Sequence, residues 1–375
     1  MPRALRRQPR YKNRMLQADP PAAHDDAAAP ATAAAQKEAA AQMLAQHPFR
    51  AAWWARSGFA QTVVTTFRRS ARADLRLERW PMPDGDFVRL HFGAGARGAP
   101  LVLLLHGLEG SRESSYVGAM HDLVHAQGWE FAVLEFRSCG GELNRASRTY
   151  HSGETGDLGF VIERLRVQAP LRPIFVVGFS LGANVLLKWL GECGTSAPEQ
   201  VVAAAAVSPP FDLEAAARQC DARYGGMIAR HFLNTLIPKA IAKGQQFPGI
   251  LDAAAVRACR TFASFDDLAT APLHGFRDAQ HYWRSSSCGQ FLATIARPTL
   301  LVASRDDPLI PGRVLPHATV AASPFLVAQF TAHGGHVGFI AGGPPWRPER
   351  WAEAHVQRFF ALHERWRRAA TAAAP

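Results

Sequence analysis

The sequence predicts an α/β fold in which a mostly parallel sheet is covered by helices on both faces. Short, continuous apolar runs recur along the chain, and strands that are buried on both faces have this pattern. Segments with helical spacing lie between most of these runs, an alternation typical of a parallel sheet. Residues 211–296 interrupt the alternation with helix-like pieces and many aromatic residues, and we interpret them as a helical lid inserted between two strands.

Two segments that alternate apolar and polar residues predict an antiparallel hairpin region near the start of the sheet, at 73–80 and 84–92. Continuous apolar runs then predict buried strands at 99–107, 129–136, 173–179, 201–207, 298–304 and 324–330. Helices are predicted at 114–128, 154–168, 181–192 and 348–368. The last of these helices is amphipathic, and we expect its apolar face to pack on the core rather than on a membrane surface.

The two ends of the chain differ in composition from its middle. Residues 1–45 are first basic and then rich in alanine, and residues 369–375 form an alanine tail, so we expect both segments to be disordered. We expect one domain between them, at 46–368, because an α/β sheet of roughly 250 residues often forms a single domain. The chain has 375 residues, and 48% of them are hydrophobic, which is enough for a large core.

The net charge of +11 lies mostly at the ends of the chain. Residues 1–14 carry six basic residues and no acidic one, and residues 345–370 carry six arginines and three glutamates. Basic tails are usually solvated, and the body has no basic stripe with interleaved aromatics, so a nucleic-acid partner is not expected. Peripheral contact between the basic ends and anionic membrane lipid stays open.

The five cysteines are widely spread and form no C-x-x-C pair, which argues against a disulfide framework and against a zinc site. No apolar run approaches the roughly 18 residues of a spanning helix. Prolines and aspartates follow the basic start, where a signal peptide would have an apolar core. We therefore expect a cytoplasmic protein.

The motif that carries chemistry is G-x-S-x-G at residues 178–182, with Ser180 at its centre. Alone this pattern is weak, because a small residue in a loop can produce it. Here it lies between a predicted strand and a predicted helix, the setting in which a nucleophilic serine sits on a strained turn with its hydroxyl exposed. The flanking glycines let neighbouring backbone pass close by, and the helix N-terminus favours developing negative charge.

A serine nucleophile needs a base and an orienting acid, which follow it in the chain order Ser, Asp or Glu, His. Two acids, Asp306 and Asp307, follow a predicted strand, and we favour Asp307 because a proline follows it directly at the strand end. Two histidines, His333 and His336, follow the last strand, and we favour His336, which lies among glycines in a loop. Each residue alone has an ordinary interpretation, but their order and placement favour the functional one.

Backbone N–H groups should complete such a site by holding the oxyanion of the reaction intermediate. Leu181, directly after the serine, predicts one donor, and Leu108, in the HGLEGS loop after the first buried strand, predicts the other. His106 precedes the serine, which is the wrong order for the base, so we assign it a structural role within that loop.

The polar segment RTYHSGETGDLG at 148–159 lies beside the expected rim of the site. We interpret it as the start of a helix, in which Ser152 or Thr155 caps the N-terminus and Glu154 and Asp157 occupy the first turn.

These motifs resemble the YheT-like branch of the α/β-hydrolases, which includes plant and animal relatives that act on lipids. The resemblance covers the chain from Gln61 to about Arg365. It rests on segments that occur in order: DGDFVRL, LLLHGLEGSRESSY, FRSCGGELN, YHSGET, VGFSLGANVLLKWL, VSPPFDL, TFASFDDLATAPLHGF, RPTLLVASRDDPLIP and HGGHVGF. The family usually has a second glycine after Gly182, where this chain has Ala183.

The resemblance implies an α/β-hydrolase fold and a serine hydrolase with Ser180, Asp307 and His336 as its triad. We expect an esterase or lipase that cleaves short- to medium-chain acyl esters, acylglycerols or other lipid esters without a metal or organic cofactor. Thioester hydrolysis or acyl transfer by the same triad stays open, as does a non-catalytic binding protein on this fold. Apolar lid residues favour an acyl pocket, although most of them could simply pack the lid: Phe211, Tyr224, Met227, Phe232 and Leu236.

Overall fold

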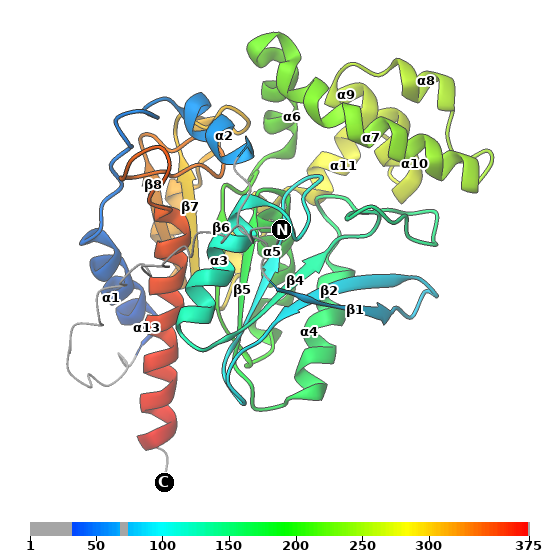
Figure 1. Cartoon of the computed structure of the whole chain (residues 1–375). Helices are drawn as coiled ribbons and strands as arrows, with labels where there is room; N and C mark the ends of the chain where they lie inside the picture. Colours follow the sequence, from blue (N-terminus) through cyan, green and yellow to red (C-terminus); the bar gives the residue numbers. More distant parts are fainter. Residues whose placement is uncertain (1–31, 68–73, 374–375) are drawn as a thin grey trace, which may run out of the picture.

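An eight-stranded sheet lies at the centre of the protein, in the strand order β1-β2-β4-β3-β5-β6-β7-β8 (Figure 1). The structure is a computed structural model and describes residues 32–67 and 74–373. The strands span β1 Arg76–Pro81, β2 Phe87–Gly93, β3 Leu101–Leu105, β4 Glu130–Glu135, β5 Ile174–Phe179, β6 Val201–Val207, β7 Thr299–Ser304 and β8 Leu326–Thr331. Each of these strands was predicted from the apolar pattern of the sequence.

The strands from β4 to β8 run parallel, whereas β2 is antiparallel to both β1 and β4. The predicted fold class and the predicted antiparallel hairpin are therefore confirmed. The register pairs Leu105 of β3 with Gly178 of β5, and Gly178 with Ala206 of β6. The carboxyl ends of these three strands consequently meet at one edge, where loops can bring distant residues together.

Helices cover both faces of the sheet because the buried strands are apolar on both sides. Leu101, Leu103 and Leu105 of β3 point into the core beneath α4 (Gly156–Gln168) and α5 (Leu181–Cys193). Val102 and Leu104 point to the other core, beneath α3 (Ser115–Ala126) and α13 (Trp351–Ala373). The apolar face of α13 is buried in that core, as predicted for the closing helix. Within residues 32–67 and 74–373, each helix is too short or too polar to span a bilayer.

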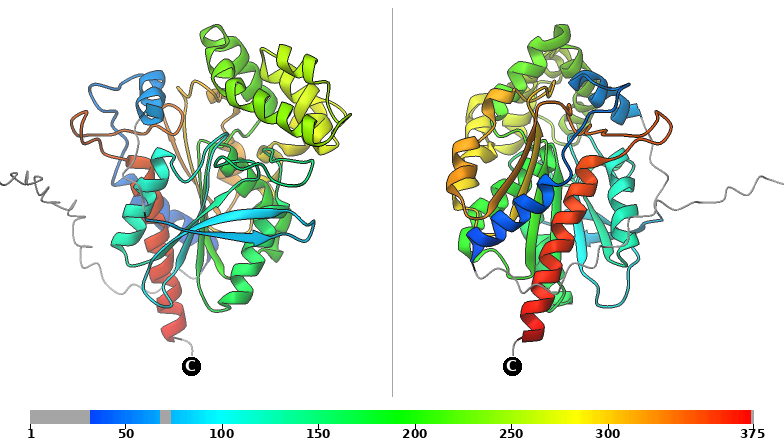
Figure 2. Two further views of the ribbon diagram at one scale, coloured as in Figure 1. Left: turned by 45° about the vertical axis from the view of Figure 1, so that its right-hand side comes forward. Right: turned by 90° about the vertical axis from the view of Figure 1, so that its left-hand side faces the viewer.

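A helical insertion joins β6 to β7 and stands above the carboxyl edge of the sheet (Figure 2). The segment that we interpret as a lid is thus helical. It has its own small apolar core, in which Leu233, Val256 and Phe265 are buried. Its helices are α6 Leu213–Ala222, α7 Met227–Gln246, α8 Ala253–Ala258, α9 Phe262–Phe265, α10 Ala271–His274 and α11 Ala279–Ser286. Shorter helical turns in or next to it are η2 Arg223–Gly226, the π-turn η3 Asp266–Thr270 and η4 Cys288–Thr294.

The expectation of disorder for residues 1–45 does not hold for the last part of that segment. Helix α1 spans Ala33–Ala45, Thr32 caps its N-terminus, and Leu44 is fully buried against the core beside α13. Alanine is the strongest helix former, so a run of alanines is stable once one face finds a packing surface. Residues 1–31 lie outside the described residues.

The expected disordered tail also differs from the structure, because α13 continues to Ala373 and only residues 374–375 lie outside the description. Besides α1, two further helices outside the insertion were not predicted, α2 Gly58–Phe67 and α12 His317–Ala322. Their β-branched or small residues gave no clear helical period. Short turns complete the chain at η1 Gly194–Ser196 and η5 Gly312–Val314.

Candidate active site

Ser180 lies on the turn between β5 and α5, with φ 52° and ψ −117°. A non-glycine residue at positive φ is strained, and the surrounding backbone holds it there. A Cβ on Gly178 would lie 2.4 Å from the carbonyl oxygen of Gly182, and a Cβ on Gly182 would lie 2.4 Å from that of Leu105. Both glycines are therefore required for the close approach of the backbone at this turn.

The structure brings Ser180, His336 and Asp307 together in a row. His336 Nε2 lies 2.8 Å from Ser180 Oγ, and His336 Nδ1 lies 2.8 Å from Asp307 Oδ2. The serine follows β5, the aspartate follows β7, and the histidine follows β8. Because a carboxylate only accepts, the imidazole donates from Nδ1 and can accept the serine proton at Nε2.

The carboxylate of Asp307 is buried and has its partners arranged on both oxygens. Its Oδ1 accepts the N–H groups of Leu309 at 2.7 Å and Ile310 at 3.0 Å, which leaves Oδ2 for His336. Backbone donors fix the orientation of a carboxyl group. The side chain is therefore prepared to hold the imidazole in one tautomer.

The other acid and histidine form a separate pair nearby. His333 Nδ1 lies 3.2 Å from Asp306 Oδ2, and the His333 side chain is 62% exposed. Asp306 Oδ1 accepts the N–H of Gly335 and the hydroxyl of Ser304. This pair ties the loop after β7 to the loop after β8, and neither member contacts Ser180 within the described contacts.

Helix α2, which was not predicted, supports the histidine loop from outside. The N–H of His336 donates to Thr62 Oγ1 at 2.8 Å. The buried amide of Gln61 donates to the carbonyl of Ile340 and accepts the N–H of the same residue. Gly58 permits this packing, because a Cβ there would lie 2.1 Å from the carbonyl oxygen of Asp306.

The two predicted oxyanion donors border the same cavity as Ser180. Leu108 and Leu181 both line it, one in the loop after β3 and one at the first position of α5. Neither backbone N–H makes a hydrogen bond to any of the residues that the structure describes. Both are thus available to an oxygen atom bound beside the serine.

His106 has the structural role that we assigned to it. Its Nδ1 donates to the carbonyl of Gly107 at 2.7 Å, and its Nε2 accepts the N–H of Phe136 at 3.1 Å. Burial lowers the pKa of His106 to about 4, so the ring stays neutral near pH 7.

The polar segment 148–159 begins helix α4, but its capping differs from the prediction. Thr155 is the N-cap residue, yet no side-chain hydrogen bond caps the helix, and its hydroxyl donates to Glu192 instead. Asp157 is buried and forms a two-point ion pair with Arg137, at 2.7 Å for each hydrogen bond. Sequence spacing cannot reveal this pair, because it joins two segments through space.

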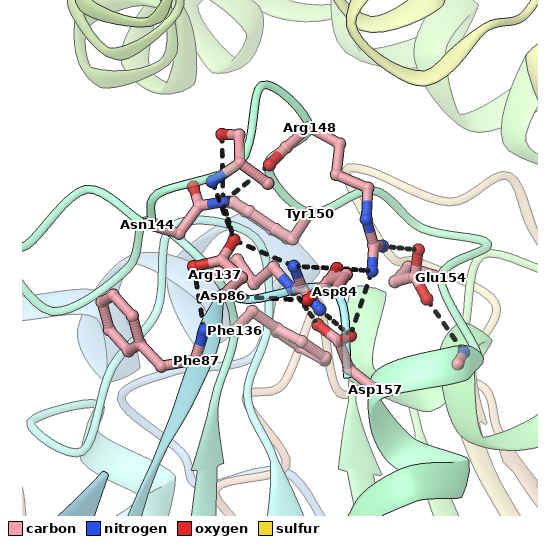
Figure 3. A network of polar contacts seen from close by, with 12 residues as sticks. Asp84, Asp86, Phe87, Phe136, Arg137, Asn144, Arg148, Tyr150, Glu154 and Asp157 are labelled. Atoms are coloured by element: carbon pink, nitrogen blue, oxygen red, sulfur yellow. Dashed lines mark hydrogen bonds and ion pairs between the residues drawn. The ribbon is translucent and has the colours of Figure 1, made fainter. Parts of the chain in front are cut away.

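Arg137 is the centre of a polar network at the rim of the site (Figure 3). Its guanidinium also binds Asp84 at 2.8 Å and Asp86 at 2.9 Å. The side chain of Asn144 donates to Asp86 Oδ2 and to the carbonyl of Arg148. The network therefore fixes the loop between β4 and α4, which borders the cavity.

The cavity beside Ser180 lies between the sheet edge and the insertion, and it encloses about 1060 Å³ including its open mouth. Of the five predicted pocket residues, Phe232 and Leu236 line it. Phe211 packs in the core instead, and Tyr224 and Met227 are exposed. No three His, Cys, Asp or Glu side chains of residues 32–67 and 74–373 are grouped as a metal site requires.

Polar side chains interrupt the apolar wall of this cavity. Burial lowers the pKa of His151 to about 3 and raises the pKa of Asp266 to about 6. The Asp266 carboxyl accepts hydrogen bonds from Thr270 Oγ1 at 2.7 Å and Trp283 Nε1 at 2.8 Å. A mostly apolar pocket with a few fixed polar groups is typical of a small-molecule site.

A family model described as alpha/beta hydrolase fold matches residues 100–343. The chain belongs to the α/β-hydrolase family. The α/β-hydrolase YheT of Escherichia coli, named as an esterase, is 38% identical over 295 residues, which cover 77% of this chain and 86% of that protein. This identity places the chain in the YheT-like branch of the family, as the sequence motifs predicted.

More distant relatives are larger than this chain. A monoacylglycerol lipase of Saccharomyces cerevisiae is 29% identical over 70% of this chain and 59% of its own length. The phospholipase ABHD3 of Bos taurus is 29% identical over 69% of this chain and 62% of its own length. Among solved structures, the Pyrococcus furiosus esterase Pf2001 has a TM-score of 0.51 at 16% identity, covering 76% of this chain and 92% of that one, which shows the fold alone.

Proposed function

We propose that this esterase- or lipase-like hydrolase cleaves carboxylic esters with Ser180 as nucleophile, His336 as general base and Asp307 as the acid that orients the imidazole. One observation carries the proposal: two hydrogen bonds of 2.8 Å join the three side chains in the order that proton transfer requires, at the wall of a large cavity. The strained turn beneath Ser180 supports it, because the turn aims the hydroxyl at that cavity.

In the first half of the reaction, His336 Nε2 takes the proton of Ser180 as Oγ attacks the ester carbonyl. Asp307 stabilises the imidazolium that forms and does not take its proton. The negative oxygen of the tetrahedral intermediate accepts the N–H groups of Leu108 and Leu181, each worth about 2.7–4 kcal/mol in the transition state. Collapse of the intermediate breaks the ester C–O bond, and the imidazolium protonates the departing alcohol.

In the second half, water replaces the alcohol. His336 takes a proton from the water as its oxygen attacks the acyl-enzyme carbonyl, and the same two N–H groups hold the second oxyanion. Breakage of the bond to Ser180 Oγ releases the carboxylic acid and returns the proton to the serine. The chemistry consumes one ester and one water and forms one alcohol and one acid.

We propose acyl esters of short to medium chain length, acylglycerols or related lipid esters as the substrate class. The apolar side chains of the insertion, among them Phe232 and Leu236, suit an acyl chain. The names of two relatives, a monoacylglycerol lipase and a phospholipase, are consistent with this class.

Activity-based labelling tests the mechanism and a chain-length series tests the substrate. A fluorophosphonate probe should label Ser180 in the native chain and leave Ser180→Ala unlabelled, although the variant keeps its fold. A panel of p-nitrophenyl esters, monoacylglycerols and acyl-CoA thioesters, each with and without an acceptor alcohol, ranks ester hydrolysis against thioester hydrolysis and acyl transfer. Wild-type turnover by Ser180→Ala would refute the proposed nucleophile, and an unlabelled native protein would favour a non-catalytic binding protein.

A lipid ester would be taken from an aggregate or a membrane, and the basic ends of the chain suit an anionic surface. Pelleting with liposomes of phosphatidylcholine, with and without phosphatidylserine, measures this contact. A chain shortened to begin at residue 32 is the matched comparison. Equal pelleting of both chains on anionic liposomes would exclude a role for the basic N-terminal segment.

A further inference from the structure

Of three consecutive backbone N–H groups in the loop after β3, the first and the third donate to tyrosine hydroxyls. The N–H of Gly107 donates to Tyr116 Oη at 2.8 Å, and the N–H of Glu109 donates to Tyr150 Oη at 2.9 Å. The N–H of Leu108 lies between them in the chain and has no partner within the described part of the protein. Two tyrosine hydroxyls thus bind the amides on either side of Leu108, whose own N–H is left for a ligand.

Glu109 keeps this loop in an unusual conformation. Its φ is 56°, in the left-handed region that non-glycine residues rarely adopt. Tyr150 Oη accepts its N–H and donates to its Oε1 at 2.8 Å, so one hydroxyl binds both the backbone and the side chain of the same residue. Burial raises the pKa of Tyr150 well above its usual value, and the hydroxyl therefore remains a neutral donor.

Both tyrosine rings are themselves held in place. Tyr116, on α3, stacks on Phe179 with ring centres 4.3 Å apart, and Phe179 directly precedes Ser180. Tyr150 stacks on Phe136 with the rings 4° from parallel, at the end of the loop that the Arg137 network fixes (Figure 3). One tyrosine is therefore anchored to the strand that carries the nucleophile, and the other to the polar network at the rim.

The insertion reaches the same loop through one lysine. Lys239, on α7, donates from Nζ to Glu109 Oε1 at 2.5 Å, and both side chains are mostly buried. A buried charge pair is sensitive to the loss of either partner. The position of α7 is thereby connected to the backbone that carries Leu108.

We propose that Tyr116 and Tyr150 are positioning residues that orient the Leu108 N–H as an oxyanion donor, with Lys239 holding Glu109 from the insertion. The inference rests on the proposed serine-hydrolase function and adds the residues that set the geometry of its oxyanion hole. A donor of this kind is effective only when it is fixed before the reaction. Reorienting it during the reaction would cost part of the free energy by which it stabilises the transition state. The hydroxyl on each side prevents the Gly107–Leu108–Glu109 peptide units from rotating.

The test compares Tyr116→Phe and Tyr150→Phe with the native chain, using p-nitrophenyl butyrate. Each variant keeps its ring and loses only the hydroxyl. We expect kcat to fall about 10- to 100-fold, less than the 10²–10³-fold loss of an entire oxyanion donor, while KM stays within about twofold. Tyr224→Phe is the matched control, because this tyrosine is exposed and lies outside the cavity lining, and its kcat should be unchanged.

Two ligands separate positioning from general damage to the pocket. An alkyl trifluoromethyl ketone adds to a serine hydroxyl and forms an oxyanion, whereas the matching alkyl methyl ether occupies the pocket without reacting. The inhibition constant of the ketone should rise in each variant by the same factor as kcat/KM falls. The affinity of the ether should not change.

The possible outcomes distinguish failure of this positioning proposal from failure of the proposed ester-hydrolase function. If the native chain neither hydrolyses the ester nor reacts with a fluorophosphonate, the proposed function fails. If the native chain is active, Ser180→Ala is inactive, and both folded tyrosine variants keep native kcat and ketone affinity, only the positioning proposal fails. An equal loss of ether and ketone affinity would likewise overturn it, because it would indicate a damaged pocket. Should Tyr150→Phe not fold, Tyr116→Phe makes the same comparison from the other side of Leu108.

Discussion

Thr62 Oγ1 accepts the backbone N–H of His336 at 2.8 Å, and this contact joins helix α2 to the loop that carries the candidate base. The two residues are 274 positions apart in the chain, so the contact joins an N-terminal helix to a C-terminal loop of the site. Since hydrogen bonds at the backbone of a loop restrict its rotation, the position of the imidazole should depend on a helix that takes no part in the chemistry.

Thr62→Val should therefore lower kcat several-fold. It should lower the unfolding free energy by at least about 1 kcal/mol, the usual value of one hydrogen bond, because Thr62 Oγ1 also donates to the carbonyl of Gly58 at 2.7 Å. Ester turnover and thermal unfolding measure the two effects. Thr65→Val is the control, because Thr65 donates only to backbone carbonyls of its own helix. A similar loss of kcat in both variants would indicate that α2 acts through general stability.

Asp307→Asn should reduce kcat by about 10⁴-fold, because an amide cannot hold the imidazole in the required tautomer. The paired control is Asp306→Asn, which alters the adjacent acid and leaves the His336 contact intact. We expect the control to lose stability rather than more than about tenfold in kcat. A reversed order of the two losses, measured with one ester, would assign the acid role to Asp306.

Gly182→Ala should prevent correct folding or lower the unfolding free energy by more than about 3 kcal/mol. The added Cβ would lie 2.4 Å from the Leu105 carbonyl oxygen, and backbone at that distance cannot move away without disrupting the sheet. Gly156→Ala, at the first position of α4, meets only the end of the Glu154 side chain and should change stability by less than about 1 kcal/mol. Urea unfolding of the two variants compares them directly.

Acid should destabilise the protein below pH 6.5 through its buried histidines. Burial lowers the pKa of His106, His355 and His363 to about 4. As the pH falls, these histidines are therefore protonated in the unfolded chain before they are protonated in the folded chain. Their contribution to stability is complete above pH 6.5 and is lost as the pH falls toward 4. Each buried histidine can remove up to about 2 kcal/mol by pH 5.

His363→Phe tests this pH dependence, because His363 Nε2 has no hydrogen-bond partner within the described structure. Chemical unfolding at pH 7.5 and at pH 5 should show a smaller loss of stability in the variant than in the native chain. An unchanged pH dependence would mean that the His363 ring is already protonated, or becomes solvated, in the folded protein.

The sheet could be predicted because its strands are short apolar runs, and Ser180 because its motif joins a strand to a helix. Asp307 and His336 followed from their positions after later strands. The same reasoning failed for segments whose apolar residues show no clear helical spacing. Helix α2 is rich in β-branched residues, and α1 is rich in alanine, so only tertiary packing shows that both are ordered.

The capping of α4 shows the same limit within the site. A hydroxyl residue at the start of a helix predicts a side-chain cap, but Thr155 binds Glu192 and Asp157 pairs with Arg137. Partners that lie on separate elements compete with local contacts and cannot be read from spacing. Tyr116 and Tyr150 were missed for this reason too, since their hydroxyls act on a loop distant in the chain.

Helix α1 packs alongside β8, the last strand of the sheet, and Lys37 Nζ binds the carbonyl oxygens of Val320 and Ser323 next to that strand. At the opposite border, β1 is charged and ends in a proline, Pro81. An uncovered border strand is a template on which another molecule can extend the sheet. Because α1 packs alongside this border strand, we expect a chain lacking residues 32–45 to aggregate at concentrations that the intact chain tolerates, as light scattering would measure.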